Sequence, residues 1–253
     1  MSSGPTLSRE DIFKELDLWP VWRLRDAPAG STKTDLAQEI PTDARSTNEN
    51  IPVRPKALSW DALREAVNTC TRCKLHKTRT QAVFGVGDEQ ADWLIVGEAP
   101  GADEDAQGEP FVGQAGRLLD AMLAAIGLRR GDNVYIANVL KSRPPGNRNP
   151  EPDEVAACMP YLLQQIELLQ PKIILAMGRF AAHNLLASKD AIANLRGRVH
   201  YFQGVPLIVT YHPAYLLRTL ADKAKAWEDL CLARQTYAAA QSAAPMQSDV
   251  IPA

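Results

Sequence analysis

Short apolar runs alternate with amphipathic stretches along the chain from Ser59 to Ala239. Apolar runs that end in Gly or a polar turn are typical of buried strands, and apolar residues spaced three and four apart are typical of helices. The runs predicted to be strands are Trp93–Gly97, Asn133–Leu140, Lys172–Met177 and Val205–Thr210. The stretches predicted to be helices are Ser59–Thr69, Ala115–Leu128, Asp153–Leu169, Arg179–Ala187 and Lys223–Ala239.

This alternation of strands and helices predicts a parallel sheet with helices on both faces. The expected fold class is therefore α/β, with three α/β/α layers around a central, mostly parallel four-stranded sheet. In such sheets ligands bind at the carboxyl ends of the strands. The loops that follow the strands are where we expect the chemistry.

The first part of the chain, residues 1–57, differs from the rest. Residues 8–18 are predicted to form a short helix, with plain disorder as an equal alternative, and residues 19–23 form an aromatic patch suited to docking. Residues 27–56 are rich in Ala, Pro, Ser, Thr and Asp without an apolar period, as in a flexible linker. We therefore expect an N-terminal extension over 1–57, one domain over 58–241 and a disordered tail over 242–253.

Composition changes this picture little. The 253 residues carry a net charge of −2 and a sequence pI of about 6.1, so any nucleic-acid contact must come from a local basic surface. No apolar run approaches the length that spans a bilayer, and Met1–Glu10 lacks the pattern of a secretory signal. We expect a cytoplasmic protein without a membrane partner.

The four cysteines of the chain include a pair, Cys70 and Cys73, separated by two residues. That gap lets two thiolates bind one metal ion or cluster. The alternatives are ordinary thiols or a redox pair, and the redox alternative is weak because no strand leads into Cys70.

The loop after the first strand, Gly97–Asp105, carries carboxylates at Asp103, Glu104 and Asp105. Acidic residues at the mouth of a sheet position water, act as a base or bind a metal, and a solvated acidic loop is the alternative. Phe111 follows just before a predicted helix. An aromatic ring there can stack on a planar base or simply pack into the core.

The second strand ends near Asn138, whose amide can read an N–H next to a C=O on a base edge, or satisfy nearby backbone. The next loop is stiffened by prolines and carries Lys141, Arg143 and Arg148. A rigid basic loop beside a sheet edge suits phosphate contacts, with a solvated charged loop as the alternative.

The fourth strand runs into Tyr211–Arg218. His212 is placed to donate a hydrogen bond to a developing anion. The apolar knuckle of Tyr215, Leu216 and Leu217 beside Arg218 suits a wedge that enters the base stack when a base is flipped out. A structural histidine and plain packing are the alternatives, but these loops share one sheet edge, and the combination favours a functional site.

Three blocks of these residues resemble the uracil-DNA glycosylase superfamily, most closely its family 4. They are Gly-Glu-Ala-Pro-Gly-Ala-Asp-Glu-Asp with Pro-Phe-Val-Gly after it, Asn138 through Arg-Pro-Pro-Gly-Asn-Arg, and His-Pro-Ala-Tyr-Leu-Leu-Arg. The resemblance implies the fold of that superfamily and a monofunctional enzyme of base excision repair. Such an enzyme flips uracil out of DNA and hydrolyses its N-glycosidic bond, leaving an abasic site, without Mg²⁺.

The resemblance also implies residue roles. Glu104 would orient or activate the attacking water, and His212 would donate toward uracil O2 and stabilise the departing anion. Glu98 and Ala99 would line the uracil pocket, Phe111 would stack on the base, and Asn138 would read its O4 and N3–H edge. The implied partner is uracil-containing DNA, and we expect a monomer. From the basic loop and the apolar knuckle, the expected DNA contacts are Lys141, Arg143, Arg148, Tyr215, Leu216 and Arg218.

The family holds a four-iron, four-sulfur cluster with four cysteines, and here three match: Cys70, Cys73 and Cys158. The remaining position is Ser142, and serine is a harder, less acidic ligand than cysteine. The alternatives are a cluster on three cysteines plus Ser142 or another group, a labile cluster, no cluster, or a structural zinc.

The loop Pro144–Glu154 contains no histidine, so the covalent bonding to abasic DNA of a related branch is not expected. A second hypothesis from a different class is a catalytically weak nucleic-acid-binding module. In that case residues 1–57 would contact a protein partner in a repair or replication assembly.

Overall fold

The computed structural model of the protein describes residues 58–242. The helix expected over residues 8–18, the aromatic patch, the linker and the tail beyond residue 242 lie outside the described residues, and the domain boundaries stay a prediction. Within the described part, none of the helices combines the length and the apolar character that a membrane crossing requires.

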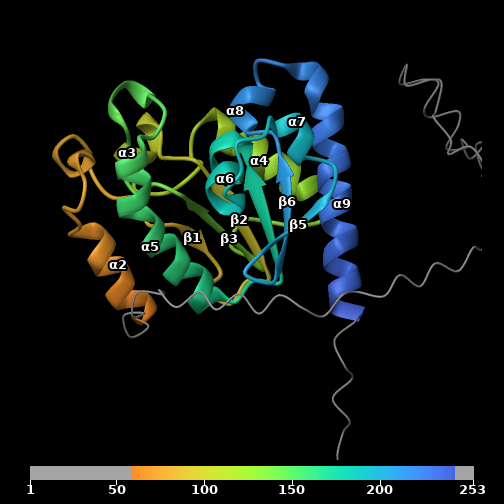
Figure 1. The fold of residues 1–253 in the computed structure, drawn as a ribbon, viewed down its shortest axis with the longest axis horizontal. Helices are drawn as coiled ribbons and strands as arrows, with labels where there is room; N and C mark the ends of the chain where they lie inside the picture. The colour runs from red at the N-terminus through yellow and green to blue at the C-terminus, as the bar shows by residue number, and fades with distance from the viewer. Residues whose placement is uncertain (1–57, 243–253) are drawn as a thin grey trace, which may run out of the picture. The chain divides into compact units, whose positions relative to one another are not determined.

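A six-stranded sheet forms the centre of the fold, in the order β1-β3-β2-β4-β6-β5 (Figure 1). Its strands are β1 (Val86–Gly87), β2 (Trp93–Gly97), β3 (Val134–Asn138), β4 (Ile173–Met177), β5 (Val199–Phe202) and β6 (Val205–Thr210). The four central strands are parallel, as predicted. The expected number of four strands was too low, because β1 and β5 pair antiparallel at the two edges. Neither edge strand has a continuous apolar run that would identify it.

Strands β2, β3 and β4 are buried at every position. Trp93 and Ile95 belong to one core cluster, whereas Leu94 and Val96 belong to another. Successive side chains of a strand point to opposite faces, so both faces of the sheet are covered and the run shows no polar alternation.

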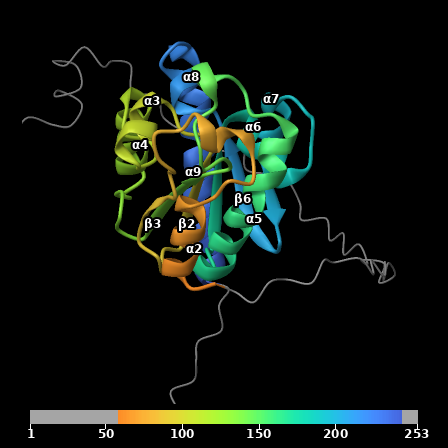
Figure 2. The same ribbon diagram turned by 90° about the vertical axis from the view of Figure 1, so that its left-hand side faces the viewer.

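Helices form the two outer layers. They are α2 (Trp60–Asn68), α3 (Ala102–Gln107), α4 (Gln114–Ala125), α5 (Pro152–Leu169), α6 (Gly178–Leu186), α7 (Ile192–Leu195), α8 (Pro213–Leu216) and α9 (Lys223–Ser242). In Figure 2, α3 and α4 lie on one side of the strands, and α5 and α6 lie on the other. Residues of α4 and α9 pack into the core cluster with Trp93, and residues of α5 and α6 pack into the one with Leu94. The expected three-layer α/β/α fold is confirmed.

The acidic triplet was expected in a loop, but it forms half of the short helix α3. Gly101 is its N-cap, and Glu104 at the third helical position accepts a hydrogen bond from the Gly101 N–H. Carboxylates in a first turn stabilise a helix because they face its positive end. This capping pattern explains why the segment is helical despite its lack of an apolar period.

Candidate active site

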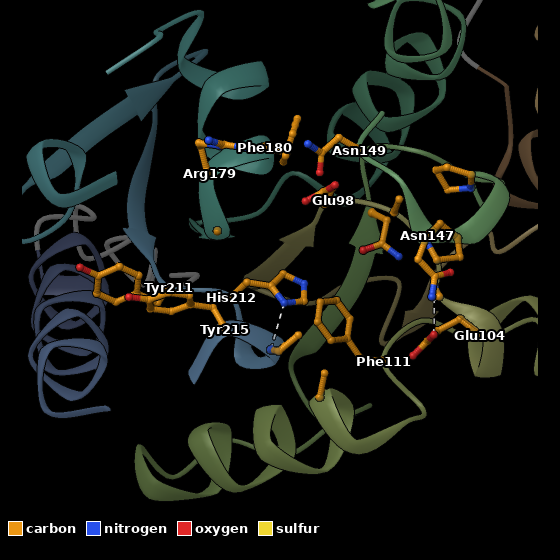
Figure 3. Close-up of a pocket in the computed structure, with 18 of the residues that line it drawn as sticks. Glu98, Glu104, Phe111, Asn147, Asn149, Arg179, Phe180, Tyr211, His212 and Tyr215 are labelled. Carbon is orange, nitrogen blue, oxygen red and sulfur yellow. Dashed lines mark hydrogen bonds between the residues drawn. The ribbon is translucent and has the colours of Figure 1, made fainter. Parts of the chain in front are cut away.

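The loops that follow the four parallel strands enclose a cavity of about 680 Å³ (Figure 3). Each strand contributes from its carboxyl end, as expected for this sheet type. The structure brings together at this cavity the residues proposed from the sequence for catalysis and base binding, namely Glu98, Ala99, Glu104, Phe111, Asn138 and His212.

Asn138 ends β3 and is only 2% exposed, and its side-chain oxygen Oδ1 has no hydrogen-bond partner among the described residues. Gly97, at the end of β2, makes room for this amide. A Cβ on Gly97 would lie 2.2 Å from Oδ1 and 2.7 Å from the ring of Phe111. A buried acceptor without a partner is costly, so the site is suited to a ligand that brings an N–H.

His212 follows β6 and lies beside Phe111, with ring centroids 5.5 Å apart and planes at 26°. Burial lowers the pKa of His212 to about 4, and the charge of Arg218 adds to this effect. The imidazole is therefore neutral at neutral pH. Its Nδ1 lies 3.1 Å from the Ala214 main-chain N–H and accepts from it (Figure 3), so the ring proton is on Nε2. A neutral histidine with Nε2–H available is a hydrogen-bond donor.

Glu104 is held by the main chain on two sides. Its carboxylate accepts from the N–H groups of Gly101 at 3.0 Å, Val112 at 3.1 Å and Gly113 at 3.4 Å. A carboxylate has about four acceptor positions, so these bonds leave about one for a water molecule. The side chain thus joins the start of α3 to the loop that carries Phe111, besides facing the cavity.

Glu98 lies in the middle of the cavity, between the loop with Asn149 and the helix start with Arg179 (Figure 3). Burial raises the pKa of Glu98 to about 7, although the positive charge of Arg179 opposes the shift. This carboxyl group is therefore partly protonated at neutral pH and can donate as well as accept.

Lys141 does not reach DNA, and its predicted phosphate contact was wrong. The side chain is 1% exposed, and its Nζ donates to the Asn138 main-chain oxygen at 2.8 Å and to Gln165 Oε1 at 2.6 Å. Burial lowers the pKa of Lys141 to about 7. The chain remains buried for several residues after β3, so the Lys141 side chain points into the core and not out of the basic loop.

Leu216 is likewise not a DNA contact, because it is 1% exposed and packs into the core. The exposed leucines of this region are Leu217 at 38% and Leu220 at 63%. The sequence pattern showed an apolar knuckle but did not show which face of the short helix α8 is turned inward. Tyr215 and Arg218 do line the cavity. The Tyr215 ring stacks on Tyr211 at 5.1 Å.

The other two basic residues of the proline-stiffened loop bind within the protein. Arg148 pairs with both oxygens of the fully buried Glu154, at 2.9 and 2.6 Å. Arg143 Nε donates to Asn147 Oδ1 at 2.7 Å. These contacts order the loop, so its rigidity comes from charge pairs as well as from proline.

Sequence reasoning missed several residues that line the cavity: Asn147, Asn149, Gly178, Arg179, Phe180 and Tyr211. Gly178, Arg179 and Phe180 directly follow β4, so the strand-end rule applied to Met177 would have found them. The two asparagines lie in an irregular loop, and no periodic pattern indicates their position.

Cys158 is buried and Cys70 and Cys73 are partly buried, all three as free thiols. Cys73 packs against the small core cluster that contains Cys158. Burial raises the pKa of Cys158, and the neighbouring Cys73 and Cys70 raise it further. Across residues 58–242, however, no three His, Cys, Asp or Glu residues are close enough to hold a metal ion. Ser142 is buried, and its Oγ accepts from Arg79 Nη1 at 2.9 Å. The three cysteines match three of the four ligands that the family resemblance implies, but in this arrangement they and Ser142 do not form a complete four-ligand site.

Comparison with known proteins agrees with this geometry. Residues 84–231 match the family model of the Uracil DNA glycosylase superfamily, and the chain belongs to that superfamily. Several of its relatives are type-4 uracil-DNA glycosylases, which confirms the resemblance predicted from the three sequence blocks. The chain is 50% identical over 167 residues to the type-4 uracil-DNA glycosylase of Archaeoglobus fulgidus, which covers 63% of this chain and 83% of the relative. It is 44% identical over 180 residues to the type-4 uracil-DNA glycosylase of Pyrobaculum aerophilum, and the matched region covers 67% of this chain and 90% of the relative. A DNA polymerase of Bacillus phage SP01 is 32% identical over 134 residues, 53% of this chain and 14% of the polymerase.

Proposed function

We propose that the protein is a monofunctional uracil-DNA glycosylase, which removes uracil from DNA by hydrolysing its N-glycosidic bond and leaves an abasic site. The observation that carries this proposal is the buried Oδ1 of Asn138, which has no hydrogen-bond partner among residues 58–242 and lines the cavity together with the ring of Phe111. An acceptor and an aromatic ring at one cavity suit a flat base with an N–H on its edge. The names of the type-4 relatives support the same activity.

The chemistry follows from the charges that form as the bond breaks. Negative charge grows on the base and positive charge grows on the sugar. In the proposal, the neutral His212 donates from Nε2 toward uracil O2 and stabilises the first charge, and the Glu104 carboxylate stabilises the second and orients the attacking water. Both interactions strengthen in the transition state, which is the condition for catalysis. The water oxygen bonds to the sugar carbon as the bond to the base breaks, and a water proton neutralises the departing uracil anion.

Base choice in the proposal rests on Asn138. Its Oδ1 accepts from uracil N3–H while its Nδ2 donates to O4. Cytosine has an acceptor and a donor at these two positions, so both contacts mismatch. A good bidentate contact of this kind discriminates between bases by ~1–3 kcal/mol.

The test of the proposal is an assay with a uracil-containing oligonucleotide, followed by alkaline cleavage of abasic sites. We expect strand breaks with the wild type, and a slower release with the variants Glu104→Ala and Asn138→Ala. Absence of breaks beside a known active glycosylase contradicts the proposal. Tight binding of abasic DNA without release would instead indicate a binding module.

Fewer residues remain proposed DNA contacts than the sequence suggested. Arg218 is exposed at the cavity, and Arg143, Arg148 and Tyr215 stay proposed DNA contacts besides their internal bonds. Uracil-containing DNA is the proposed partner of a monomeric enzyme. A protein partner for residues 1–57, outside the described residues, is part of the proposal as well.

The cofactor in the proposal is a four-iron, four-sulfur cluster on Cys70, Cys73 and Cys158, with Ser142 at the corner that lacks a thiolate. When bound, such a cluster would cross-link segments far apart in the chain, and the proposed chemistry does not pass through it.

This assignment predicts that Ser142→Cys slows the loss of iron and acid-labile sulfide to a chelator by about tenfold, because a thiolate binds iron better than a hydroxyl group. Iron and sulfide per chain, with visible absorption, are measured over time. Cys231→Ser is the control, since Cys231 lies in α9. Equal rates of loss from Ser142→Cys and wild type contradict the assignment.

Glu98 provides a prediction on stability. Its folded pKa of about 7 exceeds the ordinary value of 4.5, so the folded state binds this proton more tightly than the unfolded state. The stability from this group is fully present below pH 4.5 and is lost as the pH rises through about 7. We expect the urea midpoint of Glu98→Gln to rise relative to wild type across this range. If the urea midpoints of wild type and Glu98→Gln change with pH in parallel, the prediction is contradicted.

A further inference from the structure

The main chain at Phe111 adopts an unusual conformation. Its φ is 56°, in the left-handed region that residues with a side chain rarely adopt. A residue in such a region persists only when its surroundings fix it, and such residues cluster at functional sites. The ring that this conformation presents is 5% exposed and stacks on His212.

Arg130 supplies a large part of that fixation. Its Nη1 donates to the Pro110 main-chain oxygen at 2.9 Å, and its Nη2 donates to the Phe111 main-chain oxygen at 2.8 Å. The two bonds bind consecutive carbonyl groups to one planar guanidinium. Such a fork fixes the relative orientation of both peptide groups, which a single hydrogen bond cannot do.

The guanidinium is itself held in place. Asp120 on α4 accepts from Arg130 Nε at 3.0 Å and contacts Nη2 at 2.9 Å. The same helix passes close to the Phe111 carbonyl, since a Cβ on Gly116 would lie 1.7 Å from that oxygen. Arg130 therefore connects the strained residue to the middle of α4, and the start of that helix packs against the same carbonyl group.

Arg130 is not among the residues that line the cavity. Its contacts reach the site through the main chain of Pro110 and Phe111. We propose that Arg130 is a positioning residue, which holds the main chain of Phe111 in the left-handed conformation that places its ring beside His212 and above Gly97. The inference deepens the proposed function and rests on it.

The neighbouring residue offers a matched control. Arg129 has a side chain 81% exposed and pairs with Asp132. Arg130→Gln and Arg129→Gln remove the same charge one residue apart. We expect Arg130→Gln to lower kcat/KM for uracil release by about 10- to 100-fold, because small displacements of a positioning group are costly. Arg129→Gln stays within about twofold of wild type.

A double-mutant cycle with Phe111→Ala separates positioning from general structural damage. If Arg130 acts through the ring, Arg130→Gln causes no further loss in the Phe111→Ala background. An equal loss in both backgrounds overturns the inference. Should Arg130→Gln fail to fold, Asp120→Asn tests the same anchor and is expected to cause a smaller loss.

A readout independent of activity comes from NMR of the imidazole protons. The stacked Phe111 ring shifts the His212 resonances, which a His212→Gln spectrum identifies. We expect these resonances in Arg130→Gln to move toward their positions in Phe111→Ala, and to stay in place in Arg129→Gln. Unmoved resonances in Arg130→Gln overturn the inference. A wild type that releases no uracil contradicts the proposed function alone, because this readout still decides the role of Arg130.

Discussion

Replacing His212 with alanine is expected to slow uracil release under single-turnover conditions by about 100- to 1000-fold, the usual cost of losing a donor to a developing anion. The structure supplies the reason. The main-chain N–H of Ala214 donates to Nδ1, and burial lowers the pKa of the ring to about 4, so the ring is neutral and its proton is on Nε2. A fixed neutral donor needs no rearrangement as charge forms on the base.

The measurement uses enzyme in excess over a uracil-containing oligonucleotide, with quenched samples cleaved by alkali. His200→Ala is the control. His200 is a histidine that does not line the cavity, and its ring bonds to the Leu195 main-chain oxygen. A release rate for His212→Ala within tenfold of the control would show that another group stabilises the departing base. Above about pH 5, the release rate should show no pH-dependent step from this imidazole. The ring has a pKa of about 4 and is therefore neutral throughout that range.

The second large effect is expected for Gly97→Ala. The added methyl group would lie 2.2 Å from Asn138 Oδ1 and 2.7 Å from the Phe111 ring, closer than atoms without a bond approach each other. The amide and the ring must both move away from the positions in which they are proposed to bind the base. We expect uracil release to fall at least about 100-fold, because misplaced positioning groups cost about that much.

Gly204→Ala is the matched glycine variant, since nothing lies within 4 Å of a Cβ added at Gly204. Its φ of 84° makes that substitution strained, so it controls for a loss of stability. Urea midpoints and release rates are measured for both variants. If Gly97→Ala keeps wild-type release, the Asn138 amide and the Phe111 ring do not bind the base from their positions beside Gly97.

The central strands were predictable because burial on both faces leaves only apolar residues in them. Trp93–Gly97 and Ile173–Met177 show this directly. The edge strand Val199–Phe202 was not predictable, because its residues are only partly buried and pairing with β6 decides its conformation. The helix Ala102–Gln107 depends on a capping bond from Glu104 rather than on periodicity.

The site was predictable to the extent that strand ends mark it. The sequence indicated Asn138 and His212 because each closes a strand at the same edge. It placed Lys141 and Leu216 on the surface, yet both are buried. In each case the residue type was suited to DNA, but the inward or outward direction depends on the path of a loop or on the face of a one-turn helix. Tertiary packing determines the path of the loop and the buried face of the helix, and no local sequence pattern predicts either.

The path of the chain after β3 connects two parts of the molecule. Asn138 faces the cavity, Lys141 bonds to its carbonyl oxygen, and Ser142 lies next to Lys141 with the thiols nearby. The short segment from Asn138 to Ser142 therefore joins the amide proposed to select the base to the site proposed for the cluster. We expect base preference to depend on iron content if both proposals hold. Comparisons of base range between preparations should use samples of matched iron content.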